Sequence, residues 1–176
     1  KSIVLQHGFY PRSDPRKNMK YNYYEYLFVF SKAQEDIFYN YHESKIDHCE
    51  CFGSPLLNHK ISSLKHRDFY DLCIIEQIGT EEYFKIDEFL FLVKVVLDFA
   101  KFNNLSVAYC NRYMRLSRSI NTKNINERLY KVDSLLDDYN FVVRKEDSYQ
   151  TIFDSYLTVT KNSTMGLEAI GMNRNI

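Results

Sequence analysis

Four residues near the carboxyl end of this 176-residue sequence have the types and spacing of an anion-binding site. Ser163 and Thr164 follow a strand-like stretch, 157–160, where we expect a helix to begin, and Gly166 lies in its first turn. The start of a helix presents unpaired backbone N–H groups and the positive end of the helix dipole, which together suit a phosphate group. The two hydroxyls add hydrogen bonds, and Gly166 allows a ligand or another backbone to approach closely.

Glu168 extends this pattern, because it lies four residues after Thr164 and therefore on the same helix face, about 6 Å away. A carboxylate accepts hydrogen bonds from two vicinal hydroxyls, so a diphosphate at the helix start places a ribose within its reach. The alternative is an ordinary Ser/Thr helix cap with Glu168 on the surface. A capping box fits poorly, since it needs the glutamate three residues after the cap.

Two further positions follow strand-like stretches. Arg112 comes directly after the stretch 105–110, in a loop with Arg115 and Arg118, and guanidinium groups bind phosphate oxygens bidentately. A solvated basic loop explains the same three arginines equally well. His7 follows the stretch 3–6, and an imidazole with a pKa near 6.5 can act as a general base on a hydroxyl. A histidine that is merely hydrogen-bonded at a strand end is the alternative.

Several other chemistries lack their motifs. His48 and the two thiols of Cys49 and Cys51 suggest zinc, but no second pair has a suitable spacing, so we expect packing and no metal. The sequence contains no P-loop, no GxGxxG and no GxSxG. Nucleoside-triphosphatase, dinucleotide oxidoreductase and serine hydrolase activities therefore have no support.

The elements that must position these residues alternate between strand and helix. Strands are predicted at 27–30, around 48–52, and at 72–75, 105–110, 141–143 and 156–160, and helices at 32–41, 81–104 and 121–138, with shorter ones from about 148 and 163. This alternation predicts an α/β fold, a Rossmann-like doubly wound parallel sheet with ligands beyond the carboxyl ends of its strands.

The same patterns divide the chain. We expect 71–176 to form the compact unit and 1–70 to be a leading segment with short strands, a linker over 9–25 and irregular or weakly helical structure over 58–70. In the helix 81–104 the polar residues form one narrow stripe. That pattern predicts a helix that packs nearly all of its remaining surface.

Charge and composition exclude some classes of protein. Lys plus Arg and Asp plus Glu both number 23, so the net charge is zero and a nucleic-acid binder is not expected. The most apolar stretch, 84–102, contains six charged residues, too many for a membrane span. Four cysteines and no visible signal peptide suggest a reducing, cytoplasmic environment. The start at Lys1 and the end at Ile176 suggest a piece of a longer protein.

The run from Asn162 to Gly171, NSTMGLEAIG, resembles the ST-x-G-x-E-A signature of bacterial surface-carbohydrate and capsular polysaccharide glycosyltransferases with the B-type, two-Rossmann-domain fold. KSIVLQHGF at 1–9 resembles the QHG strand end of capsule transferases and of teichoic-acid-type polyol-phosphate transferases. FVFS at 28–31 and CFGSP at 51–55 resemble the blocks that follow. Asp147 and Ser148 resemble a turn that contacts the nucleotide. One departure is NRYM at 111–114, where the family more often has basic-x-His-Pro.

This resemblance implies half of a B-type fold, with the end of the acceptor half in 1–70 and the donor-binding domain in 71–176. A nucleotide-activated sugar or polyol donor would meet Ser163 and Thr164 through its phosphates, Glu168 through its ribose and Ser148 through its nucleotide. His7 would serve as the base in the polyol-phosphate branch. The partners would be this donor and a glycan acceptor, with no cofactor and no metal.

The implied place of work is the cytoplasm, at the inner face of the membrane through parts outside this sequence. Two alternatives stay open. One is a sugar-nucleotide epimerase of the same fold, which uses a similar Ser/Thr and Glu helix. The other is a non-catalytic interaction domain.

Overall fold

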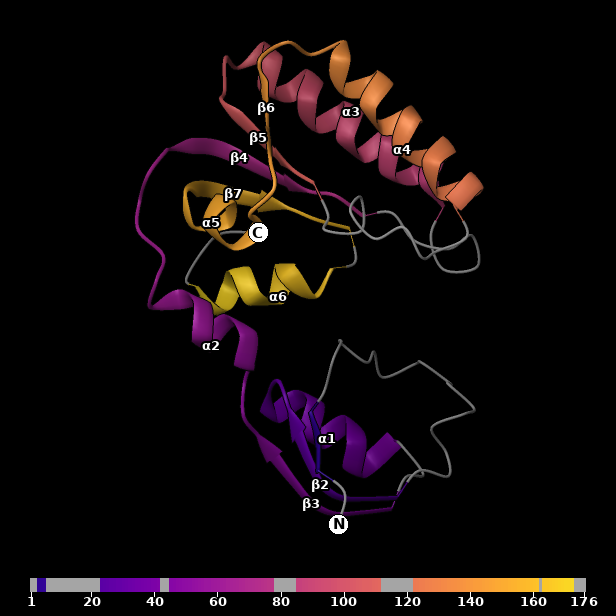
Figure 1. Cartoon of the computed structure of the whole chain (residues 1–176), viewed down its shortest axis with the longest axis vertical. Coiled ribbons are helices and arrows are strands. Elements are labelled where there is room, and N and C mark those ends of the chain that lie inside the picture. Colours follow the sequence, from indigo (N-terminus) through magenta and orange to yellow (C-terminus); the bar gives the residue numbers. More distant parts are fainter. Residues whose placement is uncertain are drawn as a thin grey trace. The chain divides into compact units, whose positions relative to one another are not determined.

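The computed structural model describes residues 3–5, 23–41, 45–77, 85–111, 122–161 and 163–172 (Figure 1). The chain divides into two compact units, Lys1–Ser62 and Ser63–Ile176. This boundary lies eight residues before the one expected from sequence, because residues 63–69 hydrogen-bond within the second unit. The Arg67 N–H donates to Asp154 Oδ1 at 3.2 Å, and Gln150 Nε2 donates to the Lys65 carbonyl at 2.6 Å.

In its described residues, the first unit is a small parallel sheet with two helices. Its elements, in chain order, are β1 (Ile3–Leu5), β2 (Tyr23–Val29), α1 (Lys32–Tyr41), β3 (Lys45–Cys51) and α2 (Pro55–Ile61). The strands lie in the order β1-β2-β3, all parallel. The buried residues of this unit form a small cluster on β2, α1 and β3, namely Leu27, Val29, Phe38 and Cys49.

One sequence prediction for this unit is wrong and another is resolved. Residues 23–25 were expected in a linker, but they begin β2, because Tyr23 and Tyr24 pair in register with Lys45 and Ile46. Residues 58–61, expected to be irregular or weakly helical, are helical and end α2. Ser54 caps that helix by accepting a hydrogen bond from the Leu57 N–H at 3.2 Å.

The second unit has the strand order of a Rossmann fold. Its elements are β4 (Tyr70–Ile75), α3 (Ile86–Phe102), β5 (Val107–Cys110), α4 (Thr122–Asp137), β6 (Val142–Lys145), α5 (Ser148–Phe153), β7 (Ser155–Val159) and α6 (Thr164–Gly171). The sheet order is β6-β5-β4-β7 and every pair is parallel. The first three strands thus extend in one direction and the fourth returns to the other side of β4. This arrangement confirms the predicted Rossmann-like parallel α/β fold.

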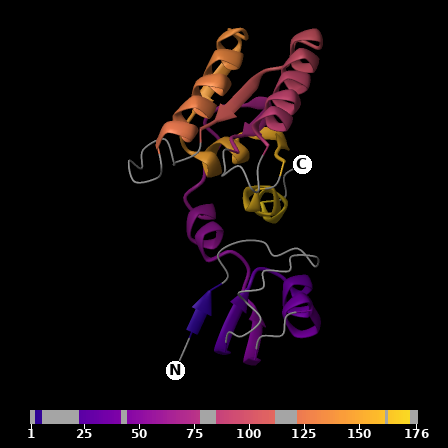
Figure 2. The ribbon, with the colours of Figure 1, turned by 90° about the vertical axis from the view of Figure 1, so that its right-hand side faces the viewer.

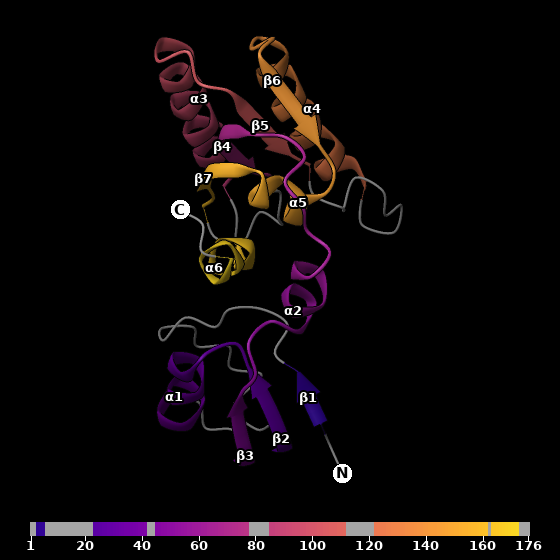
Figure 3. The ribbon, with the colours of Figure 1, turned by 90° about the vertical axis from the view of Figure 1, so that its left-hand side faces the viewer.

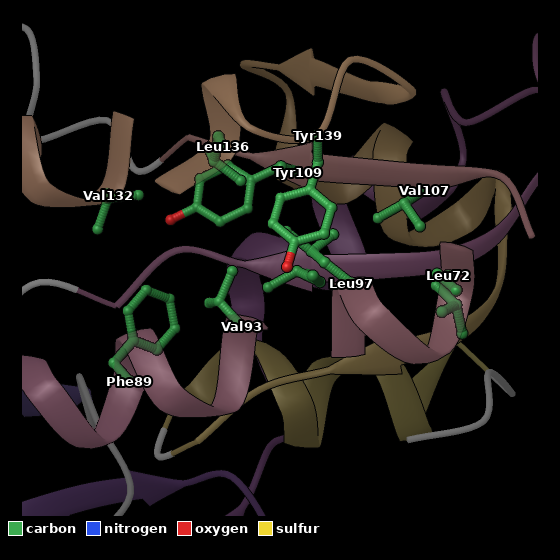
Figure 4. Packing of buried hydrophobic residues seen from close by; sticks show 11 residues of the cluster. Leu72, Phe89, Val93, Leu97, Val107, Tyr109, Val132, Leu136 and Tyr139 are labelled. Atoms are coloured by element: carbon green, nitrogen blue, oxygen red, sulfur yellow. The ribbon is translucent and has the colours of Figure 1, made fainter. Parts of the chain in front are cut away.

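The helices of this unit form two layers. Figures 1, 2 and 3 show α3 and α4 on one face of the sheet and α5 and α6 on the other. Right-handed crossovers require this, because the chain reverses direction across the sheet after β6. The α3–α4 side holds the main apolar core (Figure 4), with these residues buried: Leu72, Ile74, Phe89, Val93, Leu97, Ala100, Val107, Tyr109, Val132, Leu136 and Tyr139.

One prediction about α3 is wrong. Its inner residues are fully buried, but a second apolar row lies in solvent rather than packed as expected. Those exposed residues are Phe91, Val95, Phe99 and Phe102. The polar stripe is therefore not the only surface that α3 presents to water.

Candidate functional site

The carboxyl ends of the parallel strands form the edge of the second unit's sheet where a ligand is expected. The order of the strands reverses between the neighbours β4 and β7, and open α/β sheets generally bind ligands beyond the carboxyl ends of their strands at such a point. Gln77 follows β4 and Lys161 follows β7, and the Lys161 N–H donates to Gln77 Oε1 at 2.9 Å. Lys161 Nζ also donates to Glu88 in the first turn of α3, and this ion pair lowers the pKa of Glu88. These contacts fix the carboxyl end of β7 beside that of β4.

Ser163 is the N-cap of α6, as the sequence analysis expected for a helix that begins here. Its backbone is extended, and its Oγ accepts a hydrogen bond from the Met165 N–H at 3.2 Å. The Gly166 N–H donates to the Ser163 carbonyl at 3.0 Å. Thr164 is the first residue of α6. The helix start therefore follows β7 at the carboxyl edge of the sheet.

Gly166 is required by close packing between α6 and the end of β7. A Cβ at this position would lie 2.7 Å from Thr160 Cγ2, closer than such atoms can approach. The sequence analysis assigned Gly166 to close approach of a ligand or a backbone, and the neighbour it meets here is the Thr160 side chain. Absence of a side chain at Gly166 thus brings the first turn of α6 against the sheet.

Glu168 is buried, not on the surface as a simple helix cap would leave it. Its exposed fraction is 8%, and Oε2 accepts a hydrogen bond from the Tyr149 hydroxyl of α5 at 2.9 Å. Burial and the neighbouring carboxylate raise the pKa of Tyr149 well above its ordinary value. Tyr149 therefore remains a hydrogen-bond donor at neutral pH, and it orients the carboxylate between α5 and α6.

Ser148 begins α5, immediately before Tyr149. Its Oγ lies 3.1 Å from the Sγ of Cys110, which ends β5. Asp147 caps α5 by accepting from the Gln150 N–H at 3.1 Å. Burial raises the pKa of Cys110, so the residue is a neutral thiol. Cys110 thus joins the start of α5 to the carboxyl edge of the sheet, the edge from which α6 also begins.

Three polar atoms near this edge are buried without a hydrogen-bond partner among the described residues. They are Asn111 Oδ1, after β5, and the hydroxyls of Thr158 and Thr160, in and after β7. Buried polar groups are normally paired, so unpaired ones call for an explanation such as a ligand or water. None of these residues was expected in the site from the sequence. A sequence pattern that could have indicated them is the pair Thr158 and Thr160, polar residues at alternate positions of a strand expected to be buried.

The structure does not test every expected site residue. His7 and Arg112, with Arg115 and Arg118, lie outside the described residues. The other expected site residues lie on two helices: Ser148 begins α5, Ser163 caps α6, and α6 contains Thr164, Gly166 and Glu168. Their assignment to phosphate, ribose and nucleotide remains a prediction.

Cysteine geometry bears on the zinc alternative. Cys49 is buried, and burial raises its pKa to about 11, whereas Cys51 is exposed and its Sγ lies 3.9 Å from the Phe30 carbonyl. Within the described ranges, no three His, Cys, Asp or Glu side chains gather as metal ligands would.

The helices described here are too short or too polar to cross a bilayer.

Comparison with known proteins adds a fold-level similarity only. No family model and no curated protein matches the sequence. A solved structure described as the crystal structure of a GtfA/B complex is similar, with a TM-score of 0.44 and 15% identity over 86% of this chain. The chain spans 29% of the length of that protein. A similarity of this size supports no inference about ligand or reaction.

Proposed function

We propose that the second unit binds the nucleotide part of an activated sugar or polyol donor, as the donor-binding domain of a surface-polysaccharide glycosyltransferase. The observation that carries this proposal is the junction of β7 and α6. There a capped helix of eight residues begins at the point where the strand order reverses, and a buried carboxylate follows one turn later.

The helix start supplies the phosphate-binding part of this site. Backbone N–H groups and the dipole of α6 favour a diphosphate beside Ser163 and Thr164. These groups would stabilise the negative charge that develops on the leaving nucleotide diphosphate as the donor bond breaks.

Glu168 supplies the ribose-binding part. Tyr149 donates to one carboxylate oxygen, so the group is held in one orientation by a neighbour that is neutral at physiological pH. An oriented carboxylate can accept from the two vicinal hydroxyls of a ribose. The base on the acceptor hydroxyl would be His7, as the resemblance implies.

Titration calorimetry of the 176-residue chain with CMP, CDP, UDP and GDP tests this proposal. We expect at least one nucleoside diphosphate to bind, and to bind more tightly than the monophosphate CMP if its base is cytosine. Glu168→Ala should weaken binding by about 1–3 kcal/mol, because ribose hydroxyls then lose their buried acceptor.

Glu168→Gln is the companion variant, since it keeps the side-chain shape and an oxygen that can accept from Tyr149. Glu127→Gln is the matched control, because Glu127 is an exposed glutamate on α4. Circular dichroism establishes that each variant is folded. Absence of binding by all four nucleotides, or equal binding by the Glu168 variants and the control, would contradict the proposal.

A further inference from the structure

The outward face of α3 carries an apolar row that the fold does not cover. Phe91, Val95, Phe99 and Phe102 are 71%, 49%, 57% and 89% exposed. Their spacing of four, four and three residues places them on one face of the helix, opposite the buried row of Phe89, Val93 and Leu97. We call these four exposed residues the α3 row. Exposed aromatic residues in one contiguous row are typical of an interaction surface.

The charges beside the α3 row do not favour a lipid surface. An interfacial membrane helix carries an excess of Lys and Arg on its polar face. On and directly before α3, three lysines are balanced by three acidic residues: Lys85, Lys94, Lys101, Asp87, Glu88 and Asp98. The balance gives no net attraction to anionic lipids, so a protein surface with charges of both signs fits better.

The size of the α3 row suits a contact between two copies of this chain. With about 200 Å² for a phenylalanine side chain, the exposed parts of the row amount to roughly 500 Å². Two copies that cover each other's row would bury roughly 1,000 Å², which reaches the size expected of a specific interface. The surrounding polar residues would add a rim to this area.

The order of residues along α3 also favours a two-fold, antiparallel contact. If the axis passes beside residues 96 and 97, Phe91 of one copy lies opposite Phe102 of the second, and Val95 lies opposite Phe99. The same axis places Lys94 of each copy within reach of Asp98 of the other. Lys94 and Asp98 already form an exposed ion pair at 2.6 Å within one chain. The row and its charged flank are thus self-complementary, as an isologous interface requires.

We propose that the α3 row is a homodimer interface in which α3 packs antiparallel against α3 of a second copy. This inference does not depend on the proposed nucleotide site. Sedimentation equilibrium of the 176-residue chain over a range of concentrations should give a dimer mass at the upper end. Phe99→Glu should raise the dimer dissociation constant tenfold or more, about the effect of losing a buried aromatic contact.

Two controls make the result specific. Phe69→Glu places the same charge at another exposed phenylalanine, before β4, and should leave the dissociation constant unchanged. Lys94→Glu should weaken the dimer, because two acidic side chains then face each other across it. Circular dichroism checks that the variants are folded.

A monomer at every concentration would overturn the proposal, whether or not the chain then binds vesicles of anionic phospholipid or another protein. A dimer that Phe99→Glu and Phe69→Glu affect equally would also overturn it. A dimer as tight in Lys94→Glu as in the unaltered chain would contradict the antiparallel arrangement.

Discussion

Tyr149 and Glu168 show how a single contact can position a charged group within this unit. The tyrosine hydroxyl donates to the carboxylate at 2.9 Å, and both side chains are at most 9% exposed. A buried carboxylate that loses one of its hydrogen-bond donors is less stable, so removal of the hydroxyl should destabilise the chain. We therefore regard Tyr149 as the residue that holds Glu168 in place.

Tyr149→Phe should lower the free energy of unfolding at pH 8 by about 1–3 kcal/mol, because Glu168 loses this donor. The loss should depend on pH. Burial, and then the charge of Glu168, raise the pKa of Tyr149 above its ordinary value of 10 in the folded chain. Its stabilising contribution is therefore complete below pH 10 and decreases as pH rises above 10, where the unfolded chain ionises first.

Urea denaturation of the unaltered chain and of Tyr149→Phe between pH 8 and pH 11 checks this prediction. This interval contains the ordinary tyrosine pKa of about 10. The difference in unfolding free energy should be constant up to about pH 10 and shrink above it. A difference that stays constant or grows at high pH would show that Tyr149 is not protected in this way.

Some hydrogen-bond partners of the site residues could be predicted from the sequence, and others could not. The Ser163 cap was predictable, because a cap bonds to a backbone N–H two residues away. The Tyr149 partner of Glu168 was not, since the two residues are 19 positions apart on different helices. Only the packing of α5 and α6 on the same face of the sheet brings them together.

Close packing between α6 and β7 is the main feature at the scale of elements. Gly166→Ala should destabilise the chain by about 1–3 kcal/mol, because the new methyl group would overlap Thr160 Cγ2. The higher helix propensity of alanine offsets about 1 kcal/mol at most. Thermal and urea denaturation measure the change.

Thr160→Ser provides the matched control, because it removes Cγ2 and keeps the hydroxyl. In the Thr160→Ser background, Gly166→Ala should cost less, so the double-mutant cycle should show a coupling between the two sites. If the effects of the two substitutions on the free energy of unfolding simply added, overlap with Thr160 Cγ2 would not be the reason for a glycine at position 166.

Element types were largely predictable, and the errors have physical causes. The order of strands and helices in the second unit follows from long apolar patterns, such as the buried run of β4. The start of β2 was missed because Tyr23 and Tyr24 lie in a polar stretch and gain their strand partners only from β3. The start of the short α2 was missed, although Ser54 and Pro55 form an ordinary helix start. The exposed α3 row had no sequence signal, because apolar residues on opposite faces predict burial.

At the scale of the whole molecule, the two units differ in the size of their cores. Among the described residues, the main cluster of the second unit has eleven buried residues and that of the first has four. A unit of 62 residues is marginal by itself, because a small domain buries a smaller share of its surface. The second unit, with its own sheet covered on both faces, has what an independent domain needs.

We therefore expect a fragment of residues 63–176 to fold without the first unit. It should unfold cooperatively on heating, and its circular dichroism should show mixed helix and strand. A fragment of residues 1–62 should unfold at a lower temperature and with less cooperativity. Failure of 63–176 to unfold cooperatively would mean that its core depends on the first unit.

The most direct test of the central claim is hydrogen exchange of the whole chain with and without the nucleoside diphosphate that binds best. The account predicts slower exchange of backbone amides in 163–168, at the start of α6, and unchanged exchange in 122–137, which forms α4. Binding that leaves 163–168 unchanged, or protection confined to other segments, would contradict a nucleotide site at the start of α6.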